Sequence, residues 1–196
     1  MARHDSDEQL WQQLRDGYEP AFAELMRRYH GPLLGYARKL TTDTSVAEDG
    51  LQDLFVDLWT KRQTLGPTTA VRPYLLASLR RRLARTLHRG HWMQATAPDA
   101  LDMPFLSQFS VEETLIEDEA HQLQLRRLNH LLNRLPPRQR EALYLKFYQN
   151  LTNEQIAEVM HIGYQPATNL IYRALTFLRQ HWFEEFSPLL LVMLFS

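Results

Sequence analysis

The chain has 196 residues, and its 22 Lys and Arg almost balance its 23 Asp and Glu, which leaves a formal net charge of -1. This length allows one domain or two small ones, each with a buried core. The absence of cysteine excludes disulfides and thiolate zinc sites, and it is typical of the reducing cytoplasm, where we expect this protein.

The first residues, MARHDSDEQLWQQLRDG, contain no apolar core of a signal peptide. Ser6 and Gln9 instead fit a capping box, in which the two side chains satisfy backbone amides at the start of a helix. Apolar residues then recur at helical spacing from Phe22 to Leu40, although Gly31 and Pro32 predict a kink or a break inside this segment.

An acidic stripe follows on the next predicted helix, which we expect to begin with a capping box at Ser45 and Glu48. Asp49, Asp53 and Asp57 recur every four residues on its exposed side. Like charges at this spacing repel by a few tenths of a kcal/mol per pair. A basic partner surface would turn this repulsion into attraction, and the alternative is an ordinary solvated face.

Residues 72–89, RPYLLASLRRRLARTLHR, contain no acid and predict a strongly basic helix that begins near Pro73. Its inward stripe consists of Leu76, Leu79, Leu83 and Leu87. Its opposite face consists of Tyr74, Arg81, Arg85 and His88. An aromatic ring among arginines favours contact with single-stranded nucleic acid, because a base can stack on the ring while the arginines follow the phosphates.

Residues 91–110 contain prolines, few charges and no clear periodicity, which indicates an extended linker. The helical pattern resumes near Glu112 and continues to Pro136 and Pro137, which force a new helix to start. We therefore predict an all-α fold in four segments: a helical domain at 1–90, a linker at 91–115, a second helical domain at 116–183 and an apolar tail at 184–196.

The second domain ends in two short helices with strong boundary signals. Thr152 and Gln155 fit a capping box at the start of the first helix, and Gly163 is expected to end it in a left-handed conformation. Pro166 suits the first turn of the second helix, which is expected to start near Gln165. This arrangement is typical of a helix-turn-helix, although an ordinary helical hairpin is the alternative.

The outer face of that last helix is polar and rich in hydrogen-bonding groups. Asn and Gln can pair with adenine in the DNA major groove, and Arg can pair with guanine. The residues expected on this face are Gln165, Thr168, Asn169, Tyr172 and Arg173.

Taken in order, SVAEDGLQDLFVDLWTKR, YLLASLRRRLARTLHR, LNRLPPRQREALYLKFYQNLTNEQIAEVM and YQPATNLIYRALTFLR resemble a group IV (extracytoplasmic-function, ECF) sigma factor, of the branch common in Bacteroidota. The resemblance runs from about Phe22 to Trp182. It implies a region 2 domain, a linker in place of region 3, and a region 4 domain. It further implies core RNA polymerase and promoter DNA as partners, with an anti-sigma factor or another recruiting protein as a further partner, and no cofactor or metal.

The resemblance also assigns roles to the faces described above. One set is expected to dock on the clamp of the beta prime subunit: Asp49, Gln52, Asp53 and Asp57. A second set is expected to hold the melted minus-ten element: Lys61, Arg62, Tyr74, Arg81, Arg85 and His88. The outer face of the last helix is expected to read the minus-thirty-five element, while region 4 contacts the beta flap. Arg81 and Thr168 depart from residues frequent in the family, so the promoter sequence is not carried over.

Other functions are less consistent with the sequence. His88 and His91 have no neighbouring carboxylate or cysteine to complete a metal site, and no glycine-rich phosphate loop or nucleophile elbow is present, so we do not expect an enzyme. A helix-turn-helix regulator that never joins the polymerase, or a protein adaptor, would leave the arginine-rich helix or the polar outer face without a purpose.

The apolar tail from Ser187 onward is too short to span a bilayer, which requires about 20 residues. It is expected either to form a final helix that packs on the second domain or to dock a partner.

Overall fold

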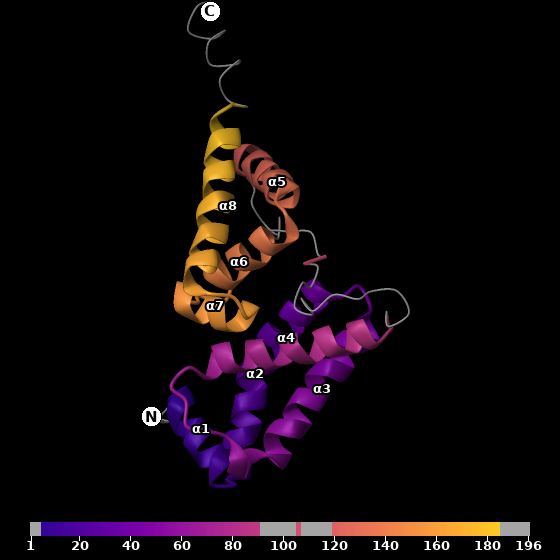
Figure 1. Cartoon of the computed structure of the whole chain (residues 1–196), viewed down its shortest axis with the longest axis vertical. Coiled ribbons are helices and arrows are strands. Elements are labelled where there is room, and N and C mark those ends of the chain that lie inside the picture. The colour runs from indigo at the N-terminus through magenta and orange to yellow at the C-terminus, as the bar shows by residue number, and fades with distance from the viewer. Residues whose placement is uncertain (1–4, 91–104, 107–118, 185–196) are drawn as a thin grey trace, which may run out of the picture.

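The computed structural model describes residues 5–90, 105–106 and 119–184, and within these ranges the chain is helical without strands. The helices form two groups, α1 to α4 and α5 to α8, as Figure 1 shows. This arrangement confirms the predicted all-α fold. The bounds are α1 Asp7–Arg15, α2 Glu19–Leu40, α3 Thr44–Thr60, a 3-10 turn at Arg62–Thr64, α4 Val71–Gly90, α5 Glu119–Arg134, α6 Pro137–Phe147, α7 Asn153–Met160 and α8 Tyr164–Glu184.

Helix α2 runs through Gly31 and Pro32 without the break that the sequence suggested as one outcome. Pro32 removes a single backbone hydrogen bond, whereas the buried Tyr29, Leu33 and Tyr36 hold both halves of the helix in the core. Tertiary packing therefore outweighs the local preference of proline.

The start of α3 differs from the prediction. Asp43, and not Ser45, caps the helix, because its Oδ1 accepts hydrogen bonds from the backbone amides of Ser45 at 2.9 Å and Val46 at 3.2 Å. Glu48 does not reach back to the cap and instead pairs with Arg38 of α2 at 3.0 Å. The Asp43 carboxylate, two residues before Ser45, satisfies backbone amides that have no acceptor within the helix, so the Ser45 hydroxyl is not needed as a cap.

Helices α3 and α4 pack closely along their apolar faces. A Cβ added at Gly50 would lie 2.7 Å from a methyl carbon of Leu83, so any larger residue at this position requires the Leu83 side chain to move. Leu76, Leu79 and Leu83 are buried as predicted. This contact fixes which sides of α3 and α4 face outward.

In the second group, Thr152 and Gln155 form both halves of the predicted capping box at α7, as Ser6 and Gln9 do at α1. The left-handed residue that ends α7 is His161, with φ of 52°, and not Gly163 as predicted. A Cβ at Gly163 would come within 3.3 Å of the Pro166 ring, so this glycine provides space for the next helix rather than an unusual φ.

The two helical groups touch, because α4 lies against α7 (Figure 1). The two described residues between α4 and α5 also contact both groups: the Phe105 ring packs on Tyr144 of α6, and the backbone amide of Leu106 donates to the carbonyl of Lys39 of α2. No helix in the described ranges is long and apolar enough to cross a membrane. The apolar tail from Ser187 lies outside the described residues.

Candidate nucleic-acid and polymerase interfaces

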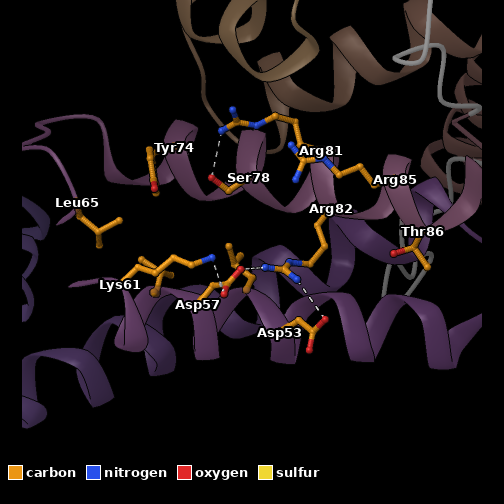
Figure 2. A pocket seen from close by; sticks show the side chains of 12 residues that line it. Asp53, Asp57, Lys61, Leu65, Tyr74, Ser78, Arg81, Arg82, Arg85 and Thr86 are labelled. Carbon is orange, nitrogen blue, oxygen red and sulfur yellow. Dashed lines mark hydrogen bonds and ion pairs between the residues drawn. The ribbon is translucent and has the colours of Figure 1, made fainter. Parts of the chain in front are cut away.

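A polar groove of about 440 Å³ lies between α3 and α4 and contains several of the predicted site residues. Figure 2 shows α4 above this groove and α3 below it. The α3 side contributes Asp53, Asp57 and Lys61, and the α4 side contributes Tyr74, Arg81 and Arg85. The structure therefore brings two residues predicted to bind polymerase together with four residues predicted to bind the minus-ten strand.

Arg82 connects the two walls of this groove. It reaches from α4 to α3, where one nitrogen lies 3.2 Å from Asp53 Oδ2 and another bonds Asp57, as Figure 2 shows. Lys61 approaches Asp57 at 2.9 Å. Its hydrogen bond, helped by the charge of Arg82, lowers the pKa of Asp57. The acidic stripe of α3 is thus partly neutralised within the molecule.

Arg81 and Arg85 keep their charge available to solvent. Both side chains are exposed, and neither has an acidic partner among the described residues. Arg81 instead donates to the carbonyl of Ala77 at 3.3 Å and to the hydroxyl of Ser78 at 3.5 Å. The α4 wall of the groove therefore presents uncompensated positive charge, which suits a phosphate backbone.

Tyr74 is held in place by a residue that the sequence reasoning missed. Its ring, with 36% of the residue exposed, meets the buried Trp11 of α1 edge-to-face with centroids 5.1 Å apart. Trp11 is fixed in turn because its Nε1 donates to the carbonyl of Gly66 at 3.0 Å. The apolar stripe of α1 predicts a buried Trp11 but does not reveal which ring it touches.

Another predicted minus-ten residue, Arg62, does not join this groove. Arg62 lies with its guanidinium 4.3 Å from the centre of the Trp59 ring, and its Nη1 donates to the carbonyl of Trp59 at 2.6 Å. The side chain is therefore held against α3 and does not line the groove. His88 belongs to α4, but its side chain lies outside the described residues.

The predicted polymerase-binding residues lie on different sides of α3. Gln52 lines a second groove between α2 and α3, together with Phe22, Phe55 and Trp59, whereas Asp49 lies exposed on the surface. Val56 lies on the rim of this second groove, one turn beyond Gln52, with 57% of its surface exposed. An apolar residue on the otherwise polar side of α3 was the sequence signal for this groove, and the prediction did not use it.

The outer face of α8 is open to solvent. Gln165, Asn169, Tyr172 and Arg173 are exposed, and Tyr172 is 68% accessible. Gln165 Nε2 donates to Asn169 Oδ1 at 3.4 Å, so these two amides lie side by side one turn apart. On the opposite face, Ala167, Ile171 and Ala174 are buried, which fixes the outward direction of the polar row.

Thr168 differs from the rest of this face, since it is only partly exposed. Its hydroxyl accepts a hydrogen bond from Asn153 Nδ2 at 3.3 Å, and the side-chain oxygen of Asn153 accepts one from Lys146 Nζ at 3.0 Å. Thr168 therefore ties α8 to the start of α7 and to α6.

Comparisons with known protein families match both helical groups. Residues 25–93 match the family described as Sigma-70 region 2, and residues 125–178 match Sigma-70, region 4. The first match covers most of α2, α3 and α4, and the second covers α6, α7 and most of α5 and α8.

Two individual proteins that the chain resembles are also described as sigma factors. The chain is 26% identical over 172 residues to the ECF RNA polymerase sigma factor RpoE of Cereibacter sphaeroides. This alignment covers 83% of this chain and 87% of that protein. It is 21% identical over 170 residues to the probable RNA polymerase sigma factor RfaY of Xanthomonas campestris pv. campestris. This second alignment covers 87% of this chain and 42% of that protein.

A solved structure supports the fold. The structure of CnrH in complex with the cytosolic domain of CnrY aligns with a TM-score of 0.59 at 22% identity, covering 91% of this chain and 97% of that one. The two matched regions occur in the order expected for a sigma factor, on the two helical groups that the structure describes. The chain therefore belongs to the sigma-70 family, with a region 2 domain followed by a region 4 domain, and it is an ECF-type RNA polymerase sigma factor.

Proposed function

We propose that this sigma factor holds the melted minus-ten strand in the groove between α3 and α4 and reads the minus-thirty-five duplex with the outer face of α8. The observation that carries this proposal is the presence of two exposed polar surfaces of different chemistry on the two domains. One combines arginines with an aromatic ring, and the other is a row of amide and hydroxyl groups.

The chemistry of the α3–α4 groove fits a single strand. Arg81 and Arg85 supply charge for phosphates, and the partly exposed Tyr74 ring, braced by Trp11, supplies a surface for one unstacked base. Base–aromatic stacking contributes about 1 to 3 kcal/mol per base. Lys61 is a further contact at the other wall, where it already balances Asp57.

The chemistry of α8 fits the major groove of duplex DNA. Asn169 and Gln165 can pair with adenine, and Arg173 can pair with guanine, because their side chains lie on the exposed side of the helix. We assign Tyr172 to the same surface. Thr168 contributes less directly, since its hydroxyl is engaged by Asn153.

We propose that core polymerase docks on α3 through its beta prime clamp, with the beta flap contacting the region 4 domain. Asp49, Gln52, Asp53 and Asp57 remain our polar candidates. The exposed Val56 and the apolar groove beside Gln52 add a hydrophobic part to this surface. An anti-sigma factor or another recruiting protein is a further proposed partner, and the branch common in Bacteroidota remains a proposal based on the quoted sequence segments.

A DNA-binding regulator that never joins the polymerase is the second candidate. It would use α8 in the same way but would have no need for an arginine and tyrosine groove on a separate domain. The two candidates therefore differ in one outcome, which is initiation by the polymerase.

Reconstituted transcription tests the proposal. Purified core RNA polymerase is incubated with this protein and a library of templates with randomised upstream sequences, and the transcripts are sequenced. We expect transcripts that start at one fixed distance from two enriched upstream motifs. Duplex binding without such initiation would support the regulator, and the same transcripts from core polymerase alone would remove the proposal.

A further inference from the structure

Helix α1 contacts the segment that joins α3 to α4. It lies outside residues 25–93, the stretch that matches Sigma-70 region 2, so the family match gives this helix no role. It nevertheless contacts the 3-10 turn that follows α3 and also contacts α4, besides its neighbour α2. Figure 1 shows α1 beside the place where the chain passes from α3 to α4. A helix without an assigned function therefore borders the proposed strand-binding groove.

Two side chains of α1 hold consecutive carbonyl groups of this connection. Arg15 Nε donates to the carbonyl of Leu65 at 2.8 Å, and Trp11 Nε1 donates to the carbonyl of Gly66 at 3.0 Å. Residues 65–70 belong to neither a helix nor a strand, so side chains or water must satisfy most of their backbone polar groups. The two hydrogen bonds therefore fix the position of the connection relative to α1.

Both donors are themselves held in place. Trp11 is only 2% exposed, so its indole ring has little freedom to turn. Arg15 Nη1 donates to Gln12 Oε1 at 2.7 Å, and Gln12 Nε2 donates in turn to Asp16 Oδ1 at 3.1 Å. The buried Leu14 anchors the same turn of the helix in the core. The two donors thus form a fixed support for the connection.

The supported residues line the groove between α3 and α4. Leu65 and Tyr74 lie at one end of this groove, whereas Arg85 and Thr86 lie at the other end, as Figure 2 shows. The Trp11 ring meets the Tyr74 ring edge-to-face, with centroids 5.1 Å apart. One buried side chain of α1 therefore contacts both the proposed base platform and the backbone next to it.

A fixed support increases the affinity of the groove for a single strand. A surface that must become ordered when it binds loses part of its binding free energy to that ordering. If the connection and the Tyr74 ring were mobile, this cost would fall on the step in which the opened strand is captured. Docking of α3 on the polymerase and duplex binding by α8 use other surfaces, so they would not carry this cost.

We propose that Trp11 and Arg15 of α1 are positioning residues for the minus-ten element, which hold the carbonyls of residues 65 and 66 and the Tyr74 ring in the arrangement that binds the opened strand. This inference rests on the proposed function. Neither residue has to touch DNA. Loss of either donor should therefore weaken strand capture and leave the binding of core polymerase unchanged.

Binding of fork-junction DNA measures strand capture separately from duplex opening. The DNA carries the two motifs found by the transcription experiment, with the minus-ten motif single-stranded, and fluorescence anisotropy follows its binding to core polymerase loaded with this protein. Arg15→Met keeps the length of the side chain but removes the donor, and it should weaken this binding about fivefold, the effect of one lost hydrogen bond. Arg15→Lys supplies a donor again and should recover most of the affinity.

Arg27→Met is the matched control, since it makes the same chemical change at an exposed arginine of α2 and should alter neither DNA binding nor polymerase binding. Trp11→Phe retains an aromatic ring beside Tyr74 and removes the Nε1 donor, so it should weaken fork-junction binding as Arg15→Met does. Titration with core polymerase should give the wild-type affinity for every variant.

Three outcomes separate this inference from the proposed function. Wild-type affinity for fork-junction DNA in both Arg15→Met and Trp11→Phe would overturn the positioning role, and the proposed function would stand if Arg81→Ala with Arg85→Ala still weakens binding. An equal loss of polymerase binding in the α1 variants would also overturn it, because α1 would then support the whole domain. If Arg81→Ala with Arg85→Ala binds as tightly as the wild type, the proposed function itself fails.

Discussion

Arg80 and Arg82 lie two residues apart on α4 and have opposite environments. Arg80 is fully buried against Glu141 of the other domain, where the carboxylate raises its pKa although burial opposes its charge. Arg82 is partly exposed and bridges Asp53 and Asp57 on α3. A rotation of about 200° along the helix separates an interdomain contact from one wall of the α3–α4 groove.

Arg82 provides a prediction about polymerase docking. Arg82→Ala should free Asp53 and Asp57 for a basic clamp surface and strengthen core binding by up to about 1 kcal/mol, the range measured for exposed ion pairs. Asp53→Arg should weaken core binding. Titration of labelled protein with core polymerase measures both variants. If both variants strengthen the binding of core polymerase, or both weaken it, the acidic stripe of α3 is not part of the docking surface.

Asn169 provides a prediction about promoter choice. Asn169→Ala should lower the free-energy preference for the correct base at one upstream base pair by about 1 to 3 kcal/mol if the amide makes a bidentate contact. Gln180→Ala, on the same helix and also exposed, is the matched control and should leave selection unchanged. Sequencing of DNA selected from a random duplex library gives the result. An unaltered motif would remove Asn169 from the reading face.

At the scale of elements, capping hydrogen bonds set where a short helix begins, and packing sets which of its sides faces outward. Helix α7 has only 8 residues, too few to be stable alone, and both halves of its capping box are formed. Helix α8 has 21 residues, and its buried stripe aims the polar row outward. The hydrogen bond that Asn153 donates to the Thr168 hydroxyl then links the start of α7 to α8.

The cap of α7 can be tested by stability. Thr152→Ala should lower the free energy of unfolding by about 1 kcal/mol, because the amide of Gln155 loses its acceptor. Thr152→Ser retains the hydroxyl and should stay close to the wild type. Urea denaturation followed by circular dichroism compares the three proteins. Equal midpoints for all three would show that the cap does not stabilise this domain.

At the scale of the whole molecule, the contact between α4 and α7 is expected to depend on pH. Burial, and then the charges of Arg81 and Arg80, lower the pKa of His161 below its ordinary value of 6.5. Glu158, on the same helix, lines the same pocket as His161. A chain whose two domains have separated therefore binds more protons than the packed one, so the contact between α4 and α7 has its full stability above about pH 6.5 and loses stability as the pH falls further.

With spin labels attached at Thr69→Cys beside α4 and at Glu154→Cys on α7, we expect a larger population of the longer label-to-label distance at pH 5.5 than at pH 7.5. His161→Gln removes the titrating group and should flatten this dependence. A dependence of equal size in the variant would assign the effect to other groups.

Much of this arrangement could be predicted because it is local. The caps at Ser6 and Thr152, the new start at Pro137 and the outward row on α8 follow from spacing within one helix. Arg80 lies four residues after Leu76 and three before Leu83, so its inward direction was also readable. Its partner Glu141 is 61 residues away, and no local pattern connects them.

The groove between α3 and α4 was predicted less completely, because it also depends on contacts between residues that are far apart in the sequence. The exposed side of α4 follows from periodicity, but the bridge of Arg82 to α3 and the position of Arg62 on Trp59 depend on how helices and turns pack. Asp43 and Ser45 are both good caps, and only the backbone geometry decides between them.

Permanganate footprinting of a promoter complex tests the central proposal most directly, because permanganate oxidises only unpaired thymines. With core polymerase and the wild-type protein, we expect reactive thymines at the minus-ten element and none at the minus-thirty-five element. The double variant Arg81→Ala with Arg85→Ala should lose the reactive thymines while duplex binding through α8 persists. Unchanged reactivity in that variant would contradict the assignment of the α3–α4 groove to the opened strand.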